Sequence, residues 1–186
     1  MSKEALLIMD MQNGIVERFA DDSEGLLDRV ATAQGAAWAA ERPVIYVRVA
    51  FREGAPEVNP KNKSFAALAG LGTMSENSDS TQVHPRLAPL DGEPIVTKRR
   101  VSAFAGSDLD VVLRSLDVDS LVLCGLATSG VVLSTTRQAA DLDFKITILS
   151  DACADADPEV HRVLMEKVFP RQATVITTAE WIKQLA

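Results

Sequence analysis

The stretch Ala5-Leu6-Leu7-Ile8-Met9-Asp10-Met11-Gln12, close to the start of the chain, decides the fold class. Its first five residues form an uninterrupted apolar run, which is typical of a β-strand that is buried on both faces. Strands of this kind belong to parallel sheets that carry helices on either side. The carboxylate of Asp10 follows directly, and a buried carboxylate is costly unless it is paired or hydrogen-bonded. The stretch therefore predicts an α/β sheet with a polar group at the end of one of its strands.

The rest of the chain repeats this alternation of strand and helix patterns. Further short runs of apolar and β-branched residues predict strands at residues 44–49, 93–96, 120–124, 145–149 and 174–176. Amphipathic patterns predict helices at residues 24–40, 108–116, 130–140, 158–169 and 179–185. This order is typical of repeated βαβ units. We therefore expect an α/β fold, with a doubly wound, mostly parallel six-stranded sheet flanked by helices.

Length and patterning predict a single domain that covers residues 1–186. A chain of 186 residues, 47% of them hydrophobic, can bury a full core but is short for two domains. Residues 52–92 interrupt the pattern, because they are rich in Pro, Gly, Asn and Ser and show little periodicity. A long irregular segment in a compact domain is usually a lid or a binding loop. A surface excursion or an oligomer contact is the alternative, and the sequence leaves both open.

Charge and composition argue against several classes of function. The net charge of −7 disfavours nucleic-acid binding, which needs a surplus of Lys and Arg. No apolar run approaches the ~20 residues of a membrane span and the first residues lack the layout of a signal peptide, so we predict a cytoplasmic protein with no membrane partner. His84 and His161 are the only histidines and stand outside any ligand cluster, so we expect no metal site. No G-x-G-x-x-G or P-loop follows the first strand, and we expect no cofactor.

Two charged residues stand where predicted strands end. In a doubly wound sheet the ligand crevice lies outside the carboxyl ends of the strands, and Asp10 and Lys98 both occupy such positions. If they lie at the same edge they can form an ion pair, in which the lysine holds the carboxylate ionised and the carboxylate can accept a proton during catalysis. A helix cap is the alternative for Asp10, and a solvated cluster with its basic neighbours is the alternative for Lys98.

Three motifs follow predicted strands along the chain. They are Asp10-x-Gln12, Lys98 before Val101-Ser102-Ala103-Phe104, and Gly125-Leu126-Ala127-Thr128-Ser129-Gly130-Val131. Together they resemble the isochorismatase-like hydrolases, a family of cysteine hydrolases, and Ser150-Asp151-Ala152-Cys153-Ala154 and residues 175–181 extend the resemblance to essentially the whole chain. The resemblance implies the isochorismatase-like hydrolase fold, a small-molecule substrate, and assembly as a homodimer or homotetramer.

The resemblance also implies a catalytic group with one member missing. In that family an Asp activates a Cys beside a Lys, and backbone N–H groups near a cis peptide at a helix start stabilise the oxyanion. Asp10 and Lys98 match the first two positions, but the position of the cysteine falls on Val131. Valine can neither attack nor give up a proton, so covalent catalysis at this position is excluded. The true isochorismatases of the family likewise lack the cysteine, usually carry glycine there, and cleave an enol ether with the Asp as acid or base and with water.

Further pocket residues follow from the resemblance alone. Those expected to line the cleft are Gln12, Ile15, Phe51 and Phe104, and those expected to supply anion-binding N–H groups at a helix N-terminus are Gly130 and Val131. For the three apolar side chains the alternative is core packing. Arg48 and Arg99 could receive a carboxylate of the substrate, with a place on the surface as the alternative.

Three hypotheses about function remain. The first is a hydrolase that acts on a small polar metabolite through Asp10, Lys98 and water, without a cysteine nucleophile. The second is a catalytically silent family member that binds a small molecule or serves in assembly. The third is a hydrolase with a displaced nucleophile, for which the candidates are Cys124, Cys153, Ser129 and Ser134; two reduced, buried thiols are the alternative for the cysteines.

Overall fold

The protein is described by a computed structural model that covers residues 3–19 and 23–185. Its strands are β1 (Glu4–Met9), β2 (Val44–Val49), β3 (Ile95–Lys98), β4 (Ser120–Leu126), β5 (Lys145–Ala154) and β6 (Thr174–Ile176). They form one sheet in the order β3-β2-β1-β4-β5-β6, and every neighbouring pair is parallel. The prediction of a doubly wound six-stranded sheet is confirmed, and the sheet is parallel throughout.

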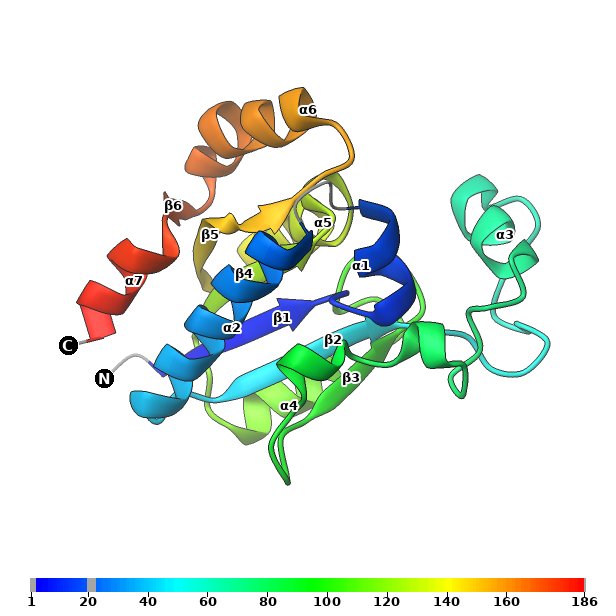
Figure 1. Ribbon diagram of the computed structural model, residues 1–186, viewed down its shortest axis with the longest axis horizontal. Coiled ribbons are helices and arrows are strands. Elements are labelled where there is room, and N and C mark those ends of the chain that lie inside the picture. The colour runs from blue at the N-terminus through cyan, green and yellow to red at the C-terminus, as the bar shows by residue number, and fades with distance from the viewer. Residues whose placement is uncertain (1–2, 20–22, 186) are drawn as a thin grey trace.

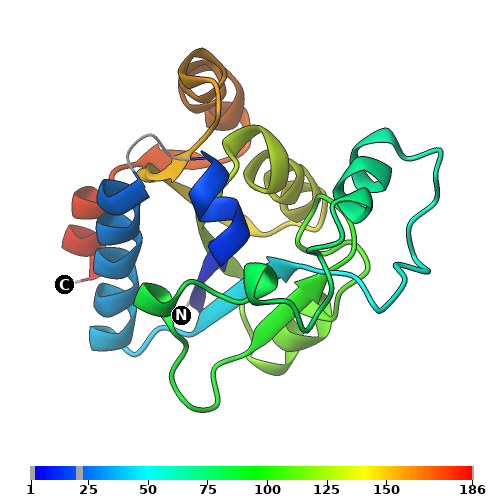
Figure 2. The same ribbon diagram turned by 45° about the vertical axis from the view of Figure 1, so that its right-hand side comes forward.

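Helices cover both faces of this sheet. They are α1 (Asn13–Phe19), α2 (Ser23–Ala39), α3 (Lys63–Gly70), α4 (Leu109–Ser115), α5 (Leu133–Asp141), α6 (Pro158–Val163) and α7 (Thr178–Leu185). Figures 1 and 2 show α2 and α7 side by side on one face, with α4 and α5 on the other. Short segments complete the chain: η1 (Asp79–Thr81), η2 (Pro85–Leu87), the π-helical η3 (Thr128–Val132) and η4 (Leu164–Val168), and η5 (Phe169–Arg171).

The main core explains why the strands read as continuous apolar runs. Residues 5–9 of β1 are each at most 1% exposed, because helices cover the strand on both sides. A smaller cluster, formed by Val49, Phe51, Phe65 and Met74, lies apart from this core and supports α3. Within the described ranges no helix is long and apolar enough to cross a bilayer.

The irregular segment is where the structure departs most from the sequence-based expectation. It contains α3, η1 and η2, and Figure 1 shows α3 standing out from the body of the molecule beside the carboxyl ends of β1 and β2. Two isolated bridges, Gln12 with Val83 and Phe51 with Ser75, tie the segment back to the sheet. The predicted strand at residues 93–96 is displaced to Ile95–Lys98, so that Lys98 is its last residue.

Candidate active site

Asp10 lies at a sharp turn of the backbone directly after β1. Its N–H donates to the carbonyl of Val47 on β2 at 2.8 Å, which continues the ladder by one residue. Its φ of 55° then carries the chain out of the sheet, in the left-handed region that Asp tolerates better than most residues. The turn directs a carboxylate that is only 6% exposed toward the carboxyl edge of the sheet.

Lys98 forms an ion pair with this carboxylate across the end of β2. Its Nζ lies 2.9 Å from Asp10 Oδ2, and the two side chains are 3% and 8% exposed. The same Nζ donates to the carbonyl of Arg100 at 3.1 Å. Because β1 and β3 both flank β2, the long lysine side chain spans one strand to reach its partner. The structure therefore brings the two charged residues together, in neither a helix cap nor a solvated cluster.

Burial decides the protonation preference of this pair. It raises the pKa of the Asp10 carboxyl above its usual value, and the charge and hydrogen bond of Lys98 offset this only in part. Asp10 Oδ1 is buried and has no hydrogen-bond partner among residues 3–19 and 23–185. A carboxyl group in this setting can hold a proton and deliver it to a bound ligand.

The pair lies in a cavity of about 320 Å³. Of the other residues singled out in the sequence, Ile15, Gly130 and Val131 line this cavity together with Asp10 and Lys98. The remaining lining comes from Gly14, Arg18, Val49, Ser64, Phe65, Leu68, Thr73, Met74, Ser80, Val101, Leu126 and Ala127. Apart from the ion pair the walls are mostly apolar, so the cavity suits a small ligand with an apolar body.

Gly125 allows the end of β4 to reach the cavity. Its φ is 123°, and a Cβ built on it would lie 1.9 Å from the carbonyl oxygen of Met9. Only glycine fits this approach of β4 to β1. The chain continues through a cis peptide between Leu126 and Ala127, in the region where the family resemblance places one, and both residues face the cavity.

Val131 and its neighbour Gly130 line the same cavity as the ion pair. Val131, the residue on which the resemblance places the nucleophile, is 2% exposed and lines the cavity. The N–H of Gly130 donates to the carbonyl of Ala127 at 3.1 Å, and it is therefore already used within the turn. Gly130 also has non-helical angles, and regular helix begins only at Leu133. The anion site expected on the amides of Gly130 and Val131 stays a prediction, and both residues line the cavity.

Gln12 is placed behind the cavity wall. Its Nε2 donates to the carbonyls of Val49 and Thr81, both at 3.0 Å, and its Oε1 accepts from the N–H of Val49 at 2.8 Å. The side chain is fully buried and its hydrogen-bonding groups serve the backbone. Gln12 thus links β2 and η1 to the end of β1 by hydrogen bonds, and these bonds hold the segments behind the cavity wall in place.

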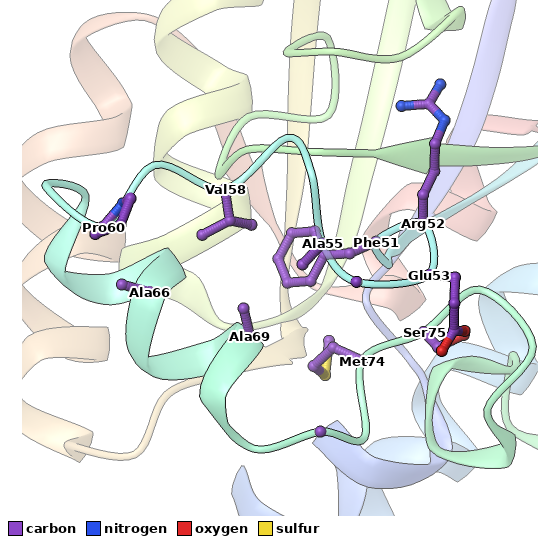
Figure 3. Close-up of a pocket in the computed structure, with 12 residues that line it drawn as sticks. Phe51, Arg52, Glu53, Ala55, Val58, Pro60, Ala66, Ala69, Met74 and Ser75 are labelled. Atoms are coloured by element: carbon purple, nitrogen blue, oxygen red, sulfur yellow. The ribbon is translucent and has the colours of Figure 1, made fainter.

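Phe51 and Phe104 also lie elsewhere than expected. Phe51 lines a second cavity of about 560 Å³ between α3 and the loop before it, which Figure 3 shows with Val58 and Met74 nearby. Phe104 packs in the main core, where its ring centroid is 6.0 Å from that of Phe144. Both side chains follow the core-packing alternative, because each has an apolar cluster at hand to fill. The larger cavity lacks the ion pair, so the smaller one is the candidate active site.

Arg48 and Arg99 hold the irregular segment in place. Arg48 donates to Thr97 Oγ1 and Gln82 Oε1, both at 3.0 Å. Arg99 pairs with Glu76 and, at 3.4 Å, with Glu57. Their guanidinium groups are engaged with protein groups of the loop, so neither is placed to receive a carboxylate of a ligand in the smaller cavity.

Sequence reasoning missed the part of the wall that α3 provides. Phe65 and Leu68 from this helix and Met74 after it line the cavity, inside a segment that shows little periodicity overall. A local signal was present: Asn62 caps the helix by accepting from the N–H of Phe65 at 3.2 Å, and apolar residues then recur at helical spacing. Arg18, on the last turn of α1, was missed as well, because α1 is short.

The displaced-nucleophile candidates are poorly placed for catalysis. Cys124 and Cys153 are buried in β4 and β5, and burial raises the pKa of the Cys124 thiol well above its usual value and that of Cys153 to about 12. A protonated, buried thiol is a weak nucleophile. Ser129 is exposed, and its N–H donates to Asp155 at 2.6 Å; Ser134 lies on α5, beyond the turn that faces the ion pair.

Removal of both thiols is expected to leave any hydrolytic activity unchanged. The Cys124→Ala, Cys153→Ala protein should match the wild type in kcat/KM, and the folded wild type should react slowly with a thiol reagent such as dithionitrobenzoate. Denaturation should release both thiols for rapid reaction, which serves as the control. A loss of activity in this variant, with its thermal unfolding temperature unchanged, would show that a thiol takes part.

No group of three or more His, Cys, Asp or Glu side chains suited to a metal ion occurs in the part of the chain that the structure describes. The arrangement that remains is a buried acid, a lysine ammonium group and a small apolar cavity.

Comparison with known proteins assigns the chain to a family. The isochorismatase domain profile matches residues 4–180. The chain is 34% identical to the uncharacterized isochorismatase family protein YwoC of Bacillus subtilis, over 98% of this chain and 94% of that protein. It is 32% identical to a probable isochorismatase of Pseudomonas chlororaphis, over 96% of this chain and 84% of that protein. The crystal structure of a cysteine hydrolase from Pseudomonas syringae pv. phaseolicola superposes with a TM-score of 0.90 at 26% identity, over 98% and 92% of the two chains. With the profile match spanning nearly its full length, this chain belongs to the isochorismatase family.

Proposed function

We propose that the protein hydrolyses a small vinyl-ether metabolite by acid–base chemistry at Asp10 and Lys98, with water and without a covalent intermediate. The observation that carries this proposal is the buried ion pair at 2.9 Å, whose Asp10 Oδ1 has no hydrogen-bond partner among the described residues. Val131 at the position of the nucleophile supports the absence of a covalent step. Isochorismate is the first compound to assay, because it carries such an ether.

The reaction needs one proton to be delivered to carbon. Protonated Asp10 transfers its proton to the terminal carbon of the vinyl group, and the electron pair of the double bond forms the new C–H bond. The ether oxygen shares its lone pair with the adjacent carbon, which becomes an oxocarbenium ion. Water adds to this carbon and returns a proton to Asp10. The resulting hemiketal collapses to a ketone and an alcohol, so that one water is consumed and Asp10 is restored.

Lys98 and the apolar wall support separate steps of this reaction. When Asp10 gives up its proton, the carboxylate that forms lies 2.9 Å from the Lys98 ammonium, which stabilises it. The same carboxylate then lies close to the oxocarbenium ion and offsets its charge. Phe65, Ile15 and Val131 limit the water in the cavity, which strengthens these electrostatic contacts.

The pH dependence of kcat/KM tests the role of Asp10 as the acid. The acid must be protonated, so kcat/KM is expected to fall about tenfold per pH unit above the pKa of Asp10. Burial raises that pKa, so the fall should begin above pH 3.8, the usual pKa of an aspartic acid. Release of keto acid from isochorismate is the readout, and the uncatalysed acid hydrolysis is subtracted at each pH. A rate that instead rises with pH to a plateau would show that Asp10 acts only as a base.

Val131 favours a second candidate function, a silent family member that binds a small molecule. The valine side chain fills the space beside the ion pair where the family keeps a nucleophile. This candidate predicts that vinyl ethers bind with no turnover above the uncatalysed rate. Robust turnover by the wild type contradicts it, and binding without turnover contradicts the proposed hydrolase.

A further inference from the structure

The described lining of the small cavity carries three ionisable side chains: Asp10, Lys98 and Arg18. The first two neutralise each other through their ion pair. Arg18 has no ion pair or hydrogen bond to any other residue within 3–19 and 23–185. Among the described residues, the positive charge of Arg18 therefore has no counter-charge.

The position of Arg18 on α1 directs it to the cavity. Ile15 and Arg18 are three residues apart in this helix, which places them on the same face, and both line the cavity. Arg18 is exposed whereas Asp10 is only 6% exposed, so the arginine stands at the mouth and the acid at the floor. A ligand that reaches both must present a polar group outward and its reactive group inward.

The cavity walls between Arg18 and Asp10 are mostly apolar and suit the carbon body of a ligand. They are formed chiefly by Phe65, Leu68, Met74, Leu126 and Val131. One of the few hydroxyl groups, that of Ser80, is already engaged as a donor to the carbonyl of Thr73. The volume of about 320 Å³ is at the small end of the ~300–1,000 Å³ range of ligand pockets.

We propose that Arg18 is the specificity-determining residue of this cavity: it binds a carboxylate of the substrate at the mouth and so selects small anions over neutral molecules of the same shape. A guanidinium group can hold a carboxylate through two parallel hydrogen bonds, which fixes orientation as well as charge. The carboxylate at the mouth would orient the carbon body so that its reactive end meets Asp10. The inference rests on the proposed function for its catalytic meaning, but anion binding by Arg18 can be measured without turnover.

Benzoate and benzamide are a suitable pair of probes, because they share one ring and differ in charge. Their affinities should be measured by titration calorimetry on the wild type, Arg18→Gln, Arg18→Lys and the control Arg114→Gln. Arg114 lies on α4 in an exposed ion pair with Asp110, so its replacement changes the net charge by the same amount away from this cavity.

Arg18→Gln is expected to weaken benzoate binding about tenfold, the effect of one charged hydrogen-bonded contact at a partly exposed site, and to leave benzamide binding unchanged. Arg18→Lys should retain part of the preference for the anion, and Arg114→Gln should behave as the wild type. The proposal is overturned if wild-type protein does not bind benzoate, if Arg18→Gln weakens both probes equally or neither, or if Arg114→Gln causes the same loss. Full turnover by Asp10→Asn would overturn the proposed function while leaving this result intact.

Discussion

Replacement of Asp10 by asparagine is expected to lower kcat/KM for vinyl-ether hydrolysis by about 10²- to 10⁴-fold, the usual contribution of a general acid. The amide has nearly the shape of the carboxyl group, but it cannot deliver a proton to carbon. Initial rates of keto acid release from isochorismate, compared between Asp10→Asn and the wild type at one pH, measure the effect. Equal rates for the two proteins would remove Asp10 from the chemistry.

This prediction needs a control for folding, because Lys98 loses its counter-charge in the variant. Leaving one member of a buried ion pair unpaired typically costs about 3–5 kcal/mol of stability. The Asp10→Asn, Lys98→Met double variant removes that unpaired charge. Its kcat/KM should be little lower than that of Asp10→Asn alone, because the two residues act as a unit. Thermal unfolding of both proteins shows whether the lost activity reflects the site or the fold.

Substitution of Gly125 by alanine is expected to lower the free energy of unfolding by about 3–5 kcal/mol. The added Cβ would lie 1.9 Å from the carbonyl oxygen of Met9, and the φ of 123° is unfavourable for any residue with a side chain. Met9 precedes Asp10, so relief of the clash must move the strand end that carries the acid. Urea denaturation measures the loss of stability, and activity should fall with it.

Gly35→Ala is the matched control for this substitution. Gly35 lies on α2 with nothing within 4 Å of the position of a Cβ. Alanine there is expected to raise the free energy of unfolding by about 0.5–1 kcal/mol, because glycine is a poor helix former. A Gly125→Ala protein as stable as the wild type, or as stable as Gly35→Ala, would contradict the close packing of β4 on β1.

The sheet and the location of the site could be predicted from the sequence because both depend on local patterns. The apolar run at residues 5–9 appears as β1 (Glu4–Met9), and residues 44–49 and 174–176 are strands with the predicted bounds. A charged residue after a buried strand then lies at the carboxyl edge of a parallel sheet by geometry alone. This is why Asp10 and Lys98 meet, although β3 itself begins two residues later than its apolar pattern suggests.

The remaining walls of the site depend on contacts between distant segments. The amide of Gln12 bonds to Val49 and Thr81, which are 37 and 69 residues away, and no local pattern reveals that these backbone groups are its partners. Phe51 likewise turns to the small cluster under α3, because Phe65 offers a ring at 5.9 Å. The family resemblance placed both residues in the cleft. In the structure Gln12 instead hydrogen-bonds to the backbone of two other segments, and Phe51 packs against Phe65.

Val131 stands where the family resemblance places the nucleophile, and valine has no group that can attack a substrate. The acid, the ammonium group and the cavity that surrounds them are present beside it. The thiols that remain, Cys124 and Cys153, are buried with raised pKa values and point to structural roles. We therefore propose acid–base chemistry with water as the reaction class of this site.

The most direct test of this account compares two cysteine-free proteins in the same vinyl-ether assay. One carries Cys124→Ala and Cys153→Ala, and the other adds Asp10→Asn. We predict that the first retains the wild-type rate and that the second loses nearly all of it. Loss of activity in the first protein while it remains folded, or retention of the full rate in the second, would contradict catalysis by the Asp10–Lys98 pair.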